Sequence, residues 1–247
     1  MVFNGDKFEM LRFWPGKSPR PEHLYCDQEG GHIEEKTHLR DLGVQVSSDL
    51  TFNIHIENVV SASTRMVAWV LRTFRRRSKT LMLTLWKSLI QSKIDYCSQL
   101  WSPNDQASIS KLEGVARSFT ARVANMEGLD YWERLQKLGM YSQERRRERY
   151  QIIFIWKLSQ GLLKGYNLPF QQNERRGLTV TVPPMAANSP AAVRKASLQV
   201  KGARLFNLIP KDLRDMTGVT ADTLRLDLMD GCPLYQTSLL ALEGRGP

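Results

Sequence analysis

Apolar residues recur every three or four positions from residue 54 onward, and this period constrains the fold more than any other feature of the sequence. Such spacing places apolar side chains on one face of a helix, which then needs a partner to cover it. The expected helices cover about 54–74, 79–95, 105–123, 131–139 and 143–161. Capping residues stand where several of them would begin, namely Ser78 or Thr80, Asn104 or Asp105, and Ser142. Because short polar turns join these helices, the block is expected to form a bundle.

The flanks of this helical block follow other patterns. Two short apolar stretches at 8–13 and 39–46 are separated by a polar connection, and they predict a small β portion. Later in the chain, 178–182 alternates like a strand, and 205–209 and 224–229 favour short helices. The expected fold is therefore mainly α, in three parts: a residual β segment at 1–52, a helical bundle at 53–165, and a loosely structured C-terminal segment with short helices at 166–247.

Composition limits the class of protein. With 247 residues, 42% of them hydrophobic and 24% charged, the chain is long enough to bury a core without disulfides. Its apolar stretches are interrupted well before the ~18 residues that a bilayer crossing needs, so no membrane partner is expected. The N-terminus has no basic segment followed by an apolar one, so no secretory signal is expected. Three widely separated cysteines fit an intracellular, reducing compartment, either nucleus or cytoplasm.

Positive charge is concentrated in one part of the chain. The formal net charge is +10, yet residues 1–57 carry six Lys and Arg against ten Asp and Glu, so the excess lies further on. Between residues 65 and 94 no acid interrupts the basic residues Arg65, Arg72, Arg75, Arg76, Arg77, Lys79, Lys87 and Lys93. A second basic group lies at 145–149. Such segments suit a polyanion, whose counterions are released on binding, but a solvated helix face is an equally compatible interpretation.

Motifs for catalysis are missing from the sequence. It contains no phosphate-binding loop, dinucleotide-binding glycine motif, nucleophile elbow, HExxH motif or adjacent pair of aspartates. His23 and Cys26, followed by His32 and His38, have a passing likeness to zinc-ligand spacing, although incidental loop residues are the favoured interpretation. We therefore predict no catalytic residue, no metal ligand and no cofactor for this chain.

Tryptophans near basic residues allow two interpretations, because such a ring either stacks on a nucleobase or belongs to a core. At helical spacing a core position is favoured, and Trp69, beside Val67 and Val70, is expected there. Trp101, in a turn before a proline, is left open between the two. The tryptophans concerned are Trp69, Trp86, Trp101, Trp132 and Trp156.

A series of short motifs runs through the chain in a fixed order. Residues 4–13 have the form N-x-x-K-x-x-x-L-x-F, and residues 42–56 begin with LGV and end with F-x-x-H-I. YCSQLWSP at 96–103, Y-x-x-R-L at 131–135 and FNLIP at 206–210 follow. Smaller matches fall between them, namely LE at 112–113, FT at 119–120, RRR at 145–147 and RG at 176–177. Together the series resembles the C-terminal part of the reverse transcriptase of non-long-terminal-repeat retrotransposons, of the LINE type and especially the jockey-like elements.

This resemblance implies the end of the palm, the thumb and the post-thumb segment of an RNA-directed DNA polymerase. The family's metal-binding aspartates precede the first motif, so this chain would lack them, and Mg²⁺ is implied only for the full-length enzyme. A fragment without polymerase activity of its own is therefore expected, one that keeps a thumb-like grip on the backbone of RNA, DNA or a hybrid. The expected contacts are the eight basic residues from Arg65 to Lys93, and a palm and fingers portion would be a protein partner.

Other functions are compatible with the sequence. One alternative is a non-catalytic helical module that pairs with another protein, since a β portion without its neighbours exposes a sheet edge. Another is an inert relic of a transposon. An enzyme of a different class would need a convergent polar pocket, of which the sequence gives no sign.

Overall fold

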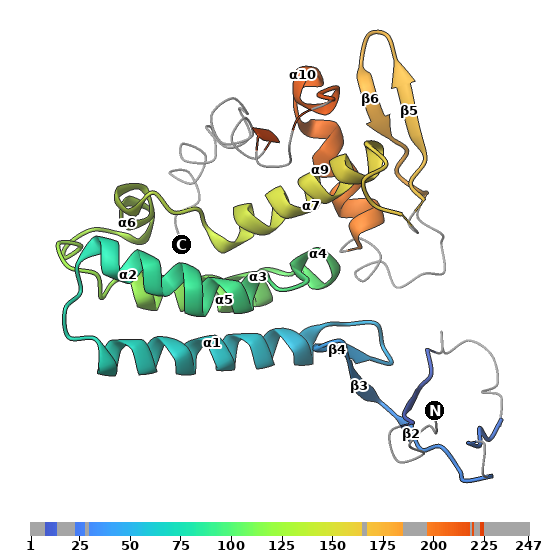
Figure 1. The fold of residues 1–247 in the computed structure, drawn as a ribbon, viewed down its shortest axis with the longest axis horizontal. Helices are drawn as coiled ribbons and strands as arrows, with labels where there is room; N and C mark the ends of the chain where they lie inside the picture. The colour runs from blue at the N-terminus through green and yellow to red at the C-terminus, as the bar shows by residue number, and fades with distance from the viewer. Residues whose placement is uncertain are drawn as a thin grey trace.

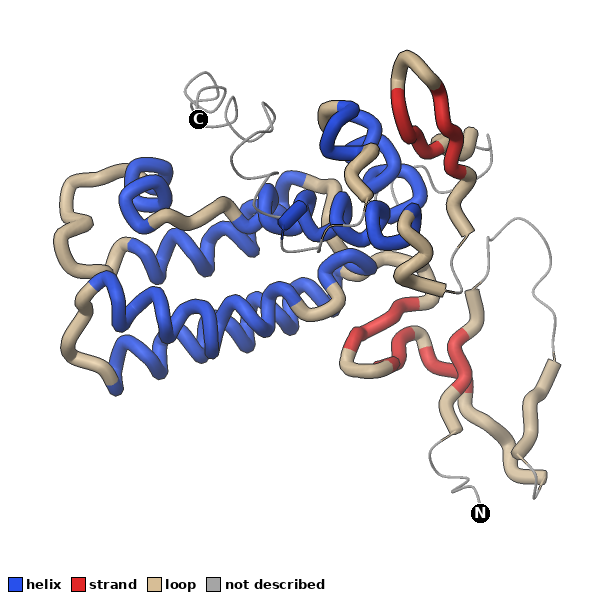
Figure 2. The backbone as a smooth tube through the Cα atoms, turned by 45° about the horizontal axis from the view of Figure 1, so that its top comes forward, coloured by secondary structure: helices blue, strands red, loops and turns tan. Residues whose placement is uncertain are grey.

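The computed structural model describes residues 8–13, 23–27, 30–164, 167–184, 197–217, 219 and 223–224. Helices dominate these residues, and two groups of short strands, one N-terminal and one in the C-terminal segment, lie on the right-hand side of both views (Figures 1 and 2). The expected mainly α fold is therefore confirmed. Over the described ranges, no helix combines the length and the apolar character that a membrane crossing requires.

Helix α1, Asn53–Thr73, is the longest of the bundle and agrees with the helix expected over 54–74. Its buried side includes Ile56, Val67 and Val70, which recur at helical spacing and face the core. The helix ends where Phe74 adopts an extended backbone, so the chain can turn back over α1.

The return segment is one helical rod made of three parts: α2 (Lys79–Leu85), the π-helical turn η2 (Trp86–Gln91) and α3 (Ser92–Asp95). It runs back alongside α1 (Figure 1). The rod confirms the helix expected over 79–95, with a wider turn in the middle. In that turn Trp86 Nε1 donates a 2.7 Å hydrogen bond to Gln91 Oε1, so the indole is buried with its polar atom satisfied.

Three further helices complete the bundle, and each begins at a side-chain cap. Asp105 accepts from Ser108 N at the start of α5, Gln106–Thr120, and Ser142 accepts from Arg145 N at the start of α7, Gln143–Ser159. Asp130 forms a capping box at the start of α6, Tyr131–Leu138. These helices agree with those expected, whereas the short α4, Ser98–Trp101, was not expected from the sequence.

The N-terminal β portion consists of two small pairs. Strands β1 (Met10–Leu11) and β2 (Glu35–Lys36) pair in parallel, and β3 (His38–Asp41) and β4 (Val44–Ser47) form an antiparallel hairpin. Leu42 and Gly43 make its two-residue turn with φ of 44° and 91°, the conformation that a type I′ hairpin requires. The expected small β portion is confirmed in the described residues.

The C-terminal segment has more structure than its sequence indicated. Strand β6, Gly177–Val180, matches the predicted alternation, but no strand was predicted for its partner β5, Phe170–Asn173, which is mostly polar. Helical elements follow at η3 (Leu198–Gly202), α9 (Ala203–Leu208) and α10 (Lys211–Arg214). Of the helix expected over 224–229, Leu224 is helical and buried, and the remaining residues lie outside the described ranges, as do the first motif residues at 4–7.

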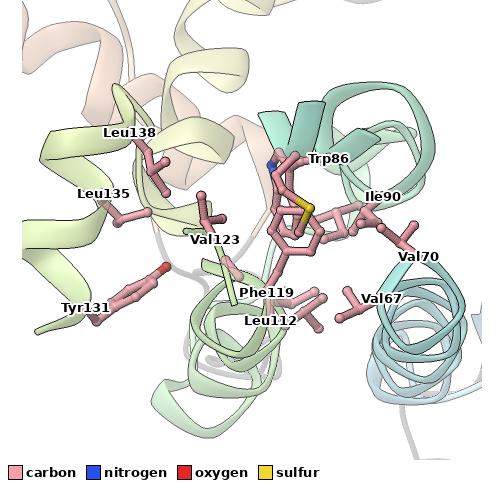
Figure 3. Close-up of a cluster of buried hydrophobic side chains, with 14 of the residues drawn as sticks. Val67, Val70, Trp86, Ile90, Leu112, Phe119, Val123, Tyr131, Leu135 and Leu138 are labelled. Atoms are coloured by element: carbon pink, nitrogen blue, oxygen red, sulfur yellow. The ribbon is translucent and has the colours of Figure 1, made fainter. Parts of the chain in front are cut away.

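Two clusters of buried side chains form the core. The larger one joins α1, the α2–α3 rod, α5 and α6; Trp86 packs on Phe119 there with ring centroids 5.0 Å apart (Figure 3). The smaller cluster joins the second half of α7 to β6 and α9, with Ile155 and Phe206 fully buried. Helix α7 therefore connects the bundle to the C-terminal segment. The domain limits at 52 and 165 stay predictions.

Candidate nucleic-acid interface

The eight predicted contact residues all lie on α1, on the rod from α2 to α3, or on the turn between them. We call this unit, residues 53–95, the basic hairpin. Arg65 and Arg72 project from α1, and the arginines at 75–77 lie in the connection to α2. Lys79, Lys87 and Lys93 follow on the return rod. The chain fold thus brings all eight to one structural unit, visible as the two adjacent helical rods of Figure 1.

Most of these cations are available to a ligand. All except the half-buried Arg77 are exposed. Within the described part of the chain, no ion pair reaches any residue of the set Arg65, Arg72, Arg75, Arg76, Lys87 and Lys93. Exposed and unpaired guanidinium groups are suited to phosphate, which they bind through two parallel hydrogen bonds.

Acidic residues at both ends of the basic hairpin are engaged elsewhere. Glu57, near the start of α1, accepts a 3.0 Å hydrogen bond from Lys111 on α5. Asp95, at the end of α3, accepts a 2.8 Å hydrogen bond from Arg146 on α7. No acid occurs in the sequence between these two residues. The positive charge of the basic hairpin is therefore not neutralised by its own carboxylates.

Two of the predicted residues have structural contacts. Lys79 Nζ donates a 2.6 Å hydrogen bond to the carbonyl oxygen of Lys137, in the last turn of α6. Arg77 Nη2 donates to the carbonyl oxygen of Leu71, in the last turn of α1, at 3.4 Å. Cations in these positions stabilise helix C-termini, which carry a partial negative charge. Arg77 and Lys79 are therefore less available for phosphate than the other six.

Lys93 lines a hollow where the β3–β4 turn meets α1 and α3. The hollow has a volume of about 320 Å³ and is lined by Gly43, His55, Val59, Ser92, Lys93 and Tyr96. The Tyr96 hydroxyl donates a 2.7 Å hydrogen bond to the carbonyl oxygen of Leu42, which fixes the turn over the hollow. These residues come from segments far apart in the sequence, so no sequence signal pointed to their meeting.

His55 closes the inner wall of this hollow. Its Nδ1 accepts a 3.2 Å hydrogen bond from Gln45 N, and its ring meets Trp101 in a T-shaped contact with centroids 5.0 Å apart. Burial, reinforced by the charge of Arg40, lowers the pKa of His55 below its usual value. At neutral pH the hollow is therefore lined by a neutral imidazole and by one cation, Lys93.

The second basic group, 145–149, is not a surface feature. Arg147 is 1% exposed and Arg149 is also buried, at 5%. Arg145 pairs with Glu148 at 2.7 Å, and Arg146 pairs with Asp95. For Arg147 and Arg149, the two interpretations of this segment, a polyanion contact and a solvated helix face, are therefore both wrong. Arg147 and Arg149 are buried because α7 packs against the bundle on one side and the C-terminal segment on the other, whereas Arg145 and Arg146 are half-buried and ion-paired.

The tryptophans divide between core and surface. Trp86, Trp101 and Trp156 are buried, and each donates from Nε1 to an acceptor within the protein. The sequence did not decide whether Trp101 stacks on a base or belongs to the core; the structure places it in the core. The core position expected for Trp69 is wrong, because this side chain is 46% exposed. One residue along a helix is a rotation of 100°, so the residue before Val70 falls on the flank of α1 rather than on its buried side.

The histidine and cysteine residues do not converge on a metal site in the described chain. Cys26 and His32 are brought together as an isolated antiparallel bridge. Nowhere among the described residues do three His, Cys, Asp or Glu side chains gather closely enough to hold an ion.

Comparison with known proteins shows a weak similarity to a relative from a nematode. The chain is 27% identical over 135 residues to an uncharacterized protein of Caenorhabditis elegans, a match that covers 53% of this chain and 66% of that protein. The chain therefore spans slightly less than two thirds of the length of this relative. No family model matches the sequence, and no solved structure matches it.

Proposed function

We propose that this chain binds nucleic acid through the backbone phosphates, with the basic hairpin as the contact surface. The observation that carries this proposal is the set of four exposed arginines, Arg65, Arg72, Arg75 and Arg76, which have no ion pair in the described chain. A protein that keeps such unpaired cations together gains affinity for a polyanion by releasing its condensed counterions. The binding would depend on salt and little on base sequence.

The dimensions of the basic hairpin suit a duplex. Helix α1 has 21 residues, which corresponds to a length of about 30 Å at 1.5 Å per residue. At 3.4 Å per base pair, this length covers about nine base pairs. The basic residues are distributed along the whole of it, from the hollow beside Lys93 to the arginines at the opposite end. Such spacing supports contacts with several successive phosphates.

We further propose that this chain is a fragment of an RNA-directed DNA polymerase from a non-long-terminal-repeat retrotransposon. It would correspond to the thumb and its flanking segments, without the catalytic aspartates. The motif series is the support for this proposal, together with the helical bundle in which the motifs at 96–103, 112–120, 131–135 and 145–147 lie. We expect the purified chain to incorporate no nucleotide, and measurable primer extension with Mg²⁺ would contradict this expectation.

A salt titration tests the binding. Affinity for a fluorescent duplex is measured at several salt concentrations for the wild type and for a variant with Arg65, Arg72, Arg75 and Arg76 changed to Gln. Each phosphate contact contributes about 0.9 to the slope of log affinity against log salt, so we expect the slope to fall by about 3 to 4. A flat slope for the wild type would contradict the proposal.

A matched control separates local contacts from net charge. Four exposed basic residues outside the basic hairpin, Arg122, Lys164, Arg175 and Arg204, are changed to Gln, which removes the same formal charge. We expect this variant to keep nearly the wild-type slope. Equal losses in the two variants would show that only the overall charge matters and would overturn the assignment to the basic hairpin.

A second candidate function is association with another polypeptide at the N-terminal β portion. Exposed apolar side chains gather there, namely Phe8, Phe13, Leu24, Tyr25 and Leu42. Within the described residues each sheet has only two strands, so backbone groups at the edges are open to pairing. Sedimentation at several concentrations tests this candidate, since Leu42→Lys should weaken any self-association or complex that uses the β3–β4 turn.

A further inference from the structure

Trp69 occupies an unusual position for a tryptophan in this fold. It lies on α1 between Arg65, four residues before it, and Arg72, three residues after it. Side chains at these spacings are neighbours on a helix surface. The two arginines are about 10 Å apart along the helix axis, with the indole between them. All three side chains are exposed.

The indole is held in place without being covered. Phe74, just beyond the end of α1, meets it in a T-shaped contact with ring centroids 6.2 Å apart. The buried Trp86, Trp101 and Trp156 all donate from Nε1 to internal acceptors. Within the described chain, Trp69 makes no such hydrogen bond. It therefore offers both an aromatic surface and a free N–H donor to a ligand.

The charged residues around Trp69 indicate whether its ligand is a protein or a nucleic acid. Tryptophan and arginine are also common in the centres of protein–protein interfaces. A protein partner, however, would have to neutralise Arg65, Arg72, Arg75 and Arg76 in a stretch, residues 58–94, that contains no acid. A nucleic acid carries a negative phosphate at every nucleotide, and each of its bases is a flat ring on which the indole can stack. Charge complementarity thus favours a nucleic acid over a protein.

An exposed base is needed for such a contact, because the faces of paired bases are stacked inside a duplex. The flank of α1 that carries Trp69 also carries Val59, Ala62 and Met66, at successive spacings of three and four residues. Val59 lines the hollow that contains Lys93. A single strand that stacks on Trp69 can therefore continue along α1 toward the hollow of Lys93, whose lining residue Val59 lies about 15 Å from Trp69 by helix rise.

We propose that Trp69 is a stacking platform for an unpaired nucleobase, with Arg65 and Arg72 binding the phosphates on either side of that nucleotide. This proposal rests on the proposed binding of nucleic acid by the basic hairpin, and it adds a preference for single strands or single-stranded ends. The preference would come from the indole, while the salt dependence would come from the arginines.

Binding of matched oligonucleotides tests the platform. Affinities of the wild type, Trp69→Ala and Trp69→Phe are measured for oligo(dT), for an abasic oligomer of the same length and for a blunt duplex. We expect Trp69→Ala to weaken oligo(dT) binding about 5- to 150-fold, the usual range for loss of one stacked base. Trp69→Phe should keep most of the affinity, because it keeps an aromatic ring. Affinity for the abasic oligomer and for the duplex should change less than twofold.

The slope of log affinity against log salt distinguishes the stacking role of Trp69 from the binding of phosphates by the basic hairpin, on which it rests. Trp69→Ala should leave the slope for oligo(dT) unchanged, whereas Arg65→Gln should lower it by about 0.7. Equal oligo(dT) affinities for Trp69→Ala and the wild type, with the arginine effects intact, would overturn the platform alone. An equal loss for the abasic oligomer would also overturn it. A wild-type protein that binds none of the three ligands would overturn both proposals.

A control variant and a measurement of thermal unfolding show whether the substitutions at Trp69 affect the fold. Leu162→Ala removes an exposed apolar side chain far from α1 in the sequence and should leave all three affinities unchanged. Thermal unfolding of Trp69→Ala should match that of the wild type, since the indole is half exposed. A variant that unfolds early is replaced by Trp69→Leu, which restores apolar volume without a ring and should show the same loss for oligo(dT).

Discussion

Arg146 donates from Nε to Oδ2 of Asp95 at 2.8 Å, and this ion pair fastens α7 to the end of the basic hairpin. Tyr150 donates to the same oxygen, and Gln91 donates to the other oxygen of the carboxylate at 2.7 Å. Asp95 is therefore fully occupied within the protein. The pair has two consequences: it holds the bundle together, and it keeps a carboxylate away from the surface proposed for nucleic acid.

Removing the charge of Asp95 should destabilise the fold. Asp95→Asn keeps the shape of the side chain but weakens the hydrogen bonds from Arg146, Tyr150 and Gln91. Hydrogen bonds to charged groups contribute about 1.5–3 kcal/mol, and we expect a loss of free energy of unfolding in that range. Urea denaturation measures it. The control is Glu57→Gln, which breaks an exposed pair with Lys111 and should cost less than about 1 kcal/mol. Equal losses in the two variants would contradict the prediction.

The positions of the helices could be predicted from the sequence because burial repeats along each one. Ile56, Val67 and Val70 share one side of α1, and a cap residue marks the start of α5 and of α7. The strand β5 could not be predicted, since its residues are polar. It is held through its partner β6, where Leu178 N donates to Asp215 and Val180 N donates to Asn207. Those contacts span about thirty residues and leave no local signal.

The candidate site was predictable only in part. The eight basic residues were predicted as contacts because they are close together in the sequence, and one helical hairpin carries them all; their role stays a prediction. The burial of Arg147 was not predictable, because a run of charges is usually solvated and only the packing of α7 against α4 and α5 decides otherwise. The hollow beside Lys93 depends on a turn, a helix start and a helix end that meet only in the folded chain.

The capping box of α6 should contribute measurably to stability. Asp130 Oδ1 accepts from Glu133 N, and Glu133 Oε2 accepts from Asp130 N, both at 2.8 Å. Replacing a capping Asp with Ala costs about 0.5–2 kcal/mol, and we expect Asp130→Ala to fall in this range. Asp130→Asn keeps the acceptor and should cost much less. Urea denaturation checks the pair of variants, and equal midpoints for Asp130→Ala and the wild type would rule out a stabilising cap.

Protonation of His55 should destabilise the protein in mild acid. Burial and the charge of Arg40 lower the pKa of His55, so the folded chain binds this proton less readily than the unfolded chain. Stability should therefore fall as pH drops below about 6.5, the usual pKa of histidine. His55→Gln keeps an acceptor for Gln45 N and should remove this part of the pH dependence. The exposed His38→Gln is the control and should retain it. Parallel curves of unfolding free energy against pH for His55→Gln and the wild type would contradict the prediction.

Glu113 should give the opposite pH dependence. Its carboxylate lies in the core, where it accepts from the hydroxyl of Tyr131 and, at 3.0 Å, from Glu144 N. Burial raises the pKa of Glu113, and these two hydrogen bonds offset the rise only in part. The folded chain therefore holds the proton more tightly than the unfolded chain, and the stability that protonated Glu113 supplies is lost as pH rises through the raised pKa.

Two variants test this dependence. The side chain of Glu113→Gln is neutral at every pH. The free energy of unfolding of this variant should therefore increase relative to that of the wild type as pH rises above about 4.5, the usual pKa of a glutamate. Tyr131→Phe removes the hydrogen bond that favours the carboxylate, so it should raise the pKa of Glu113 further and extend the loss of stability to higher pH. Denaturation at successive pH values measures both effects. A constant difference between Glu113→Gln and the wild type across the range would show that Glu113 has the same pKa in the folded and the unfolded chain, and it would contradict the prediction.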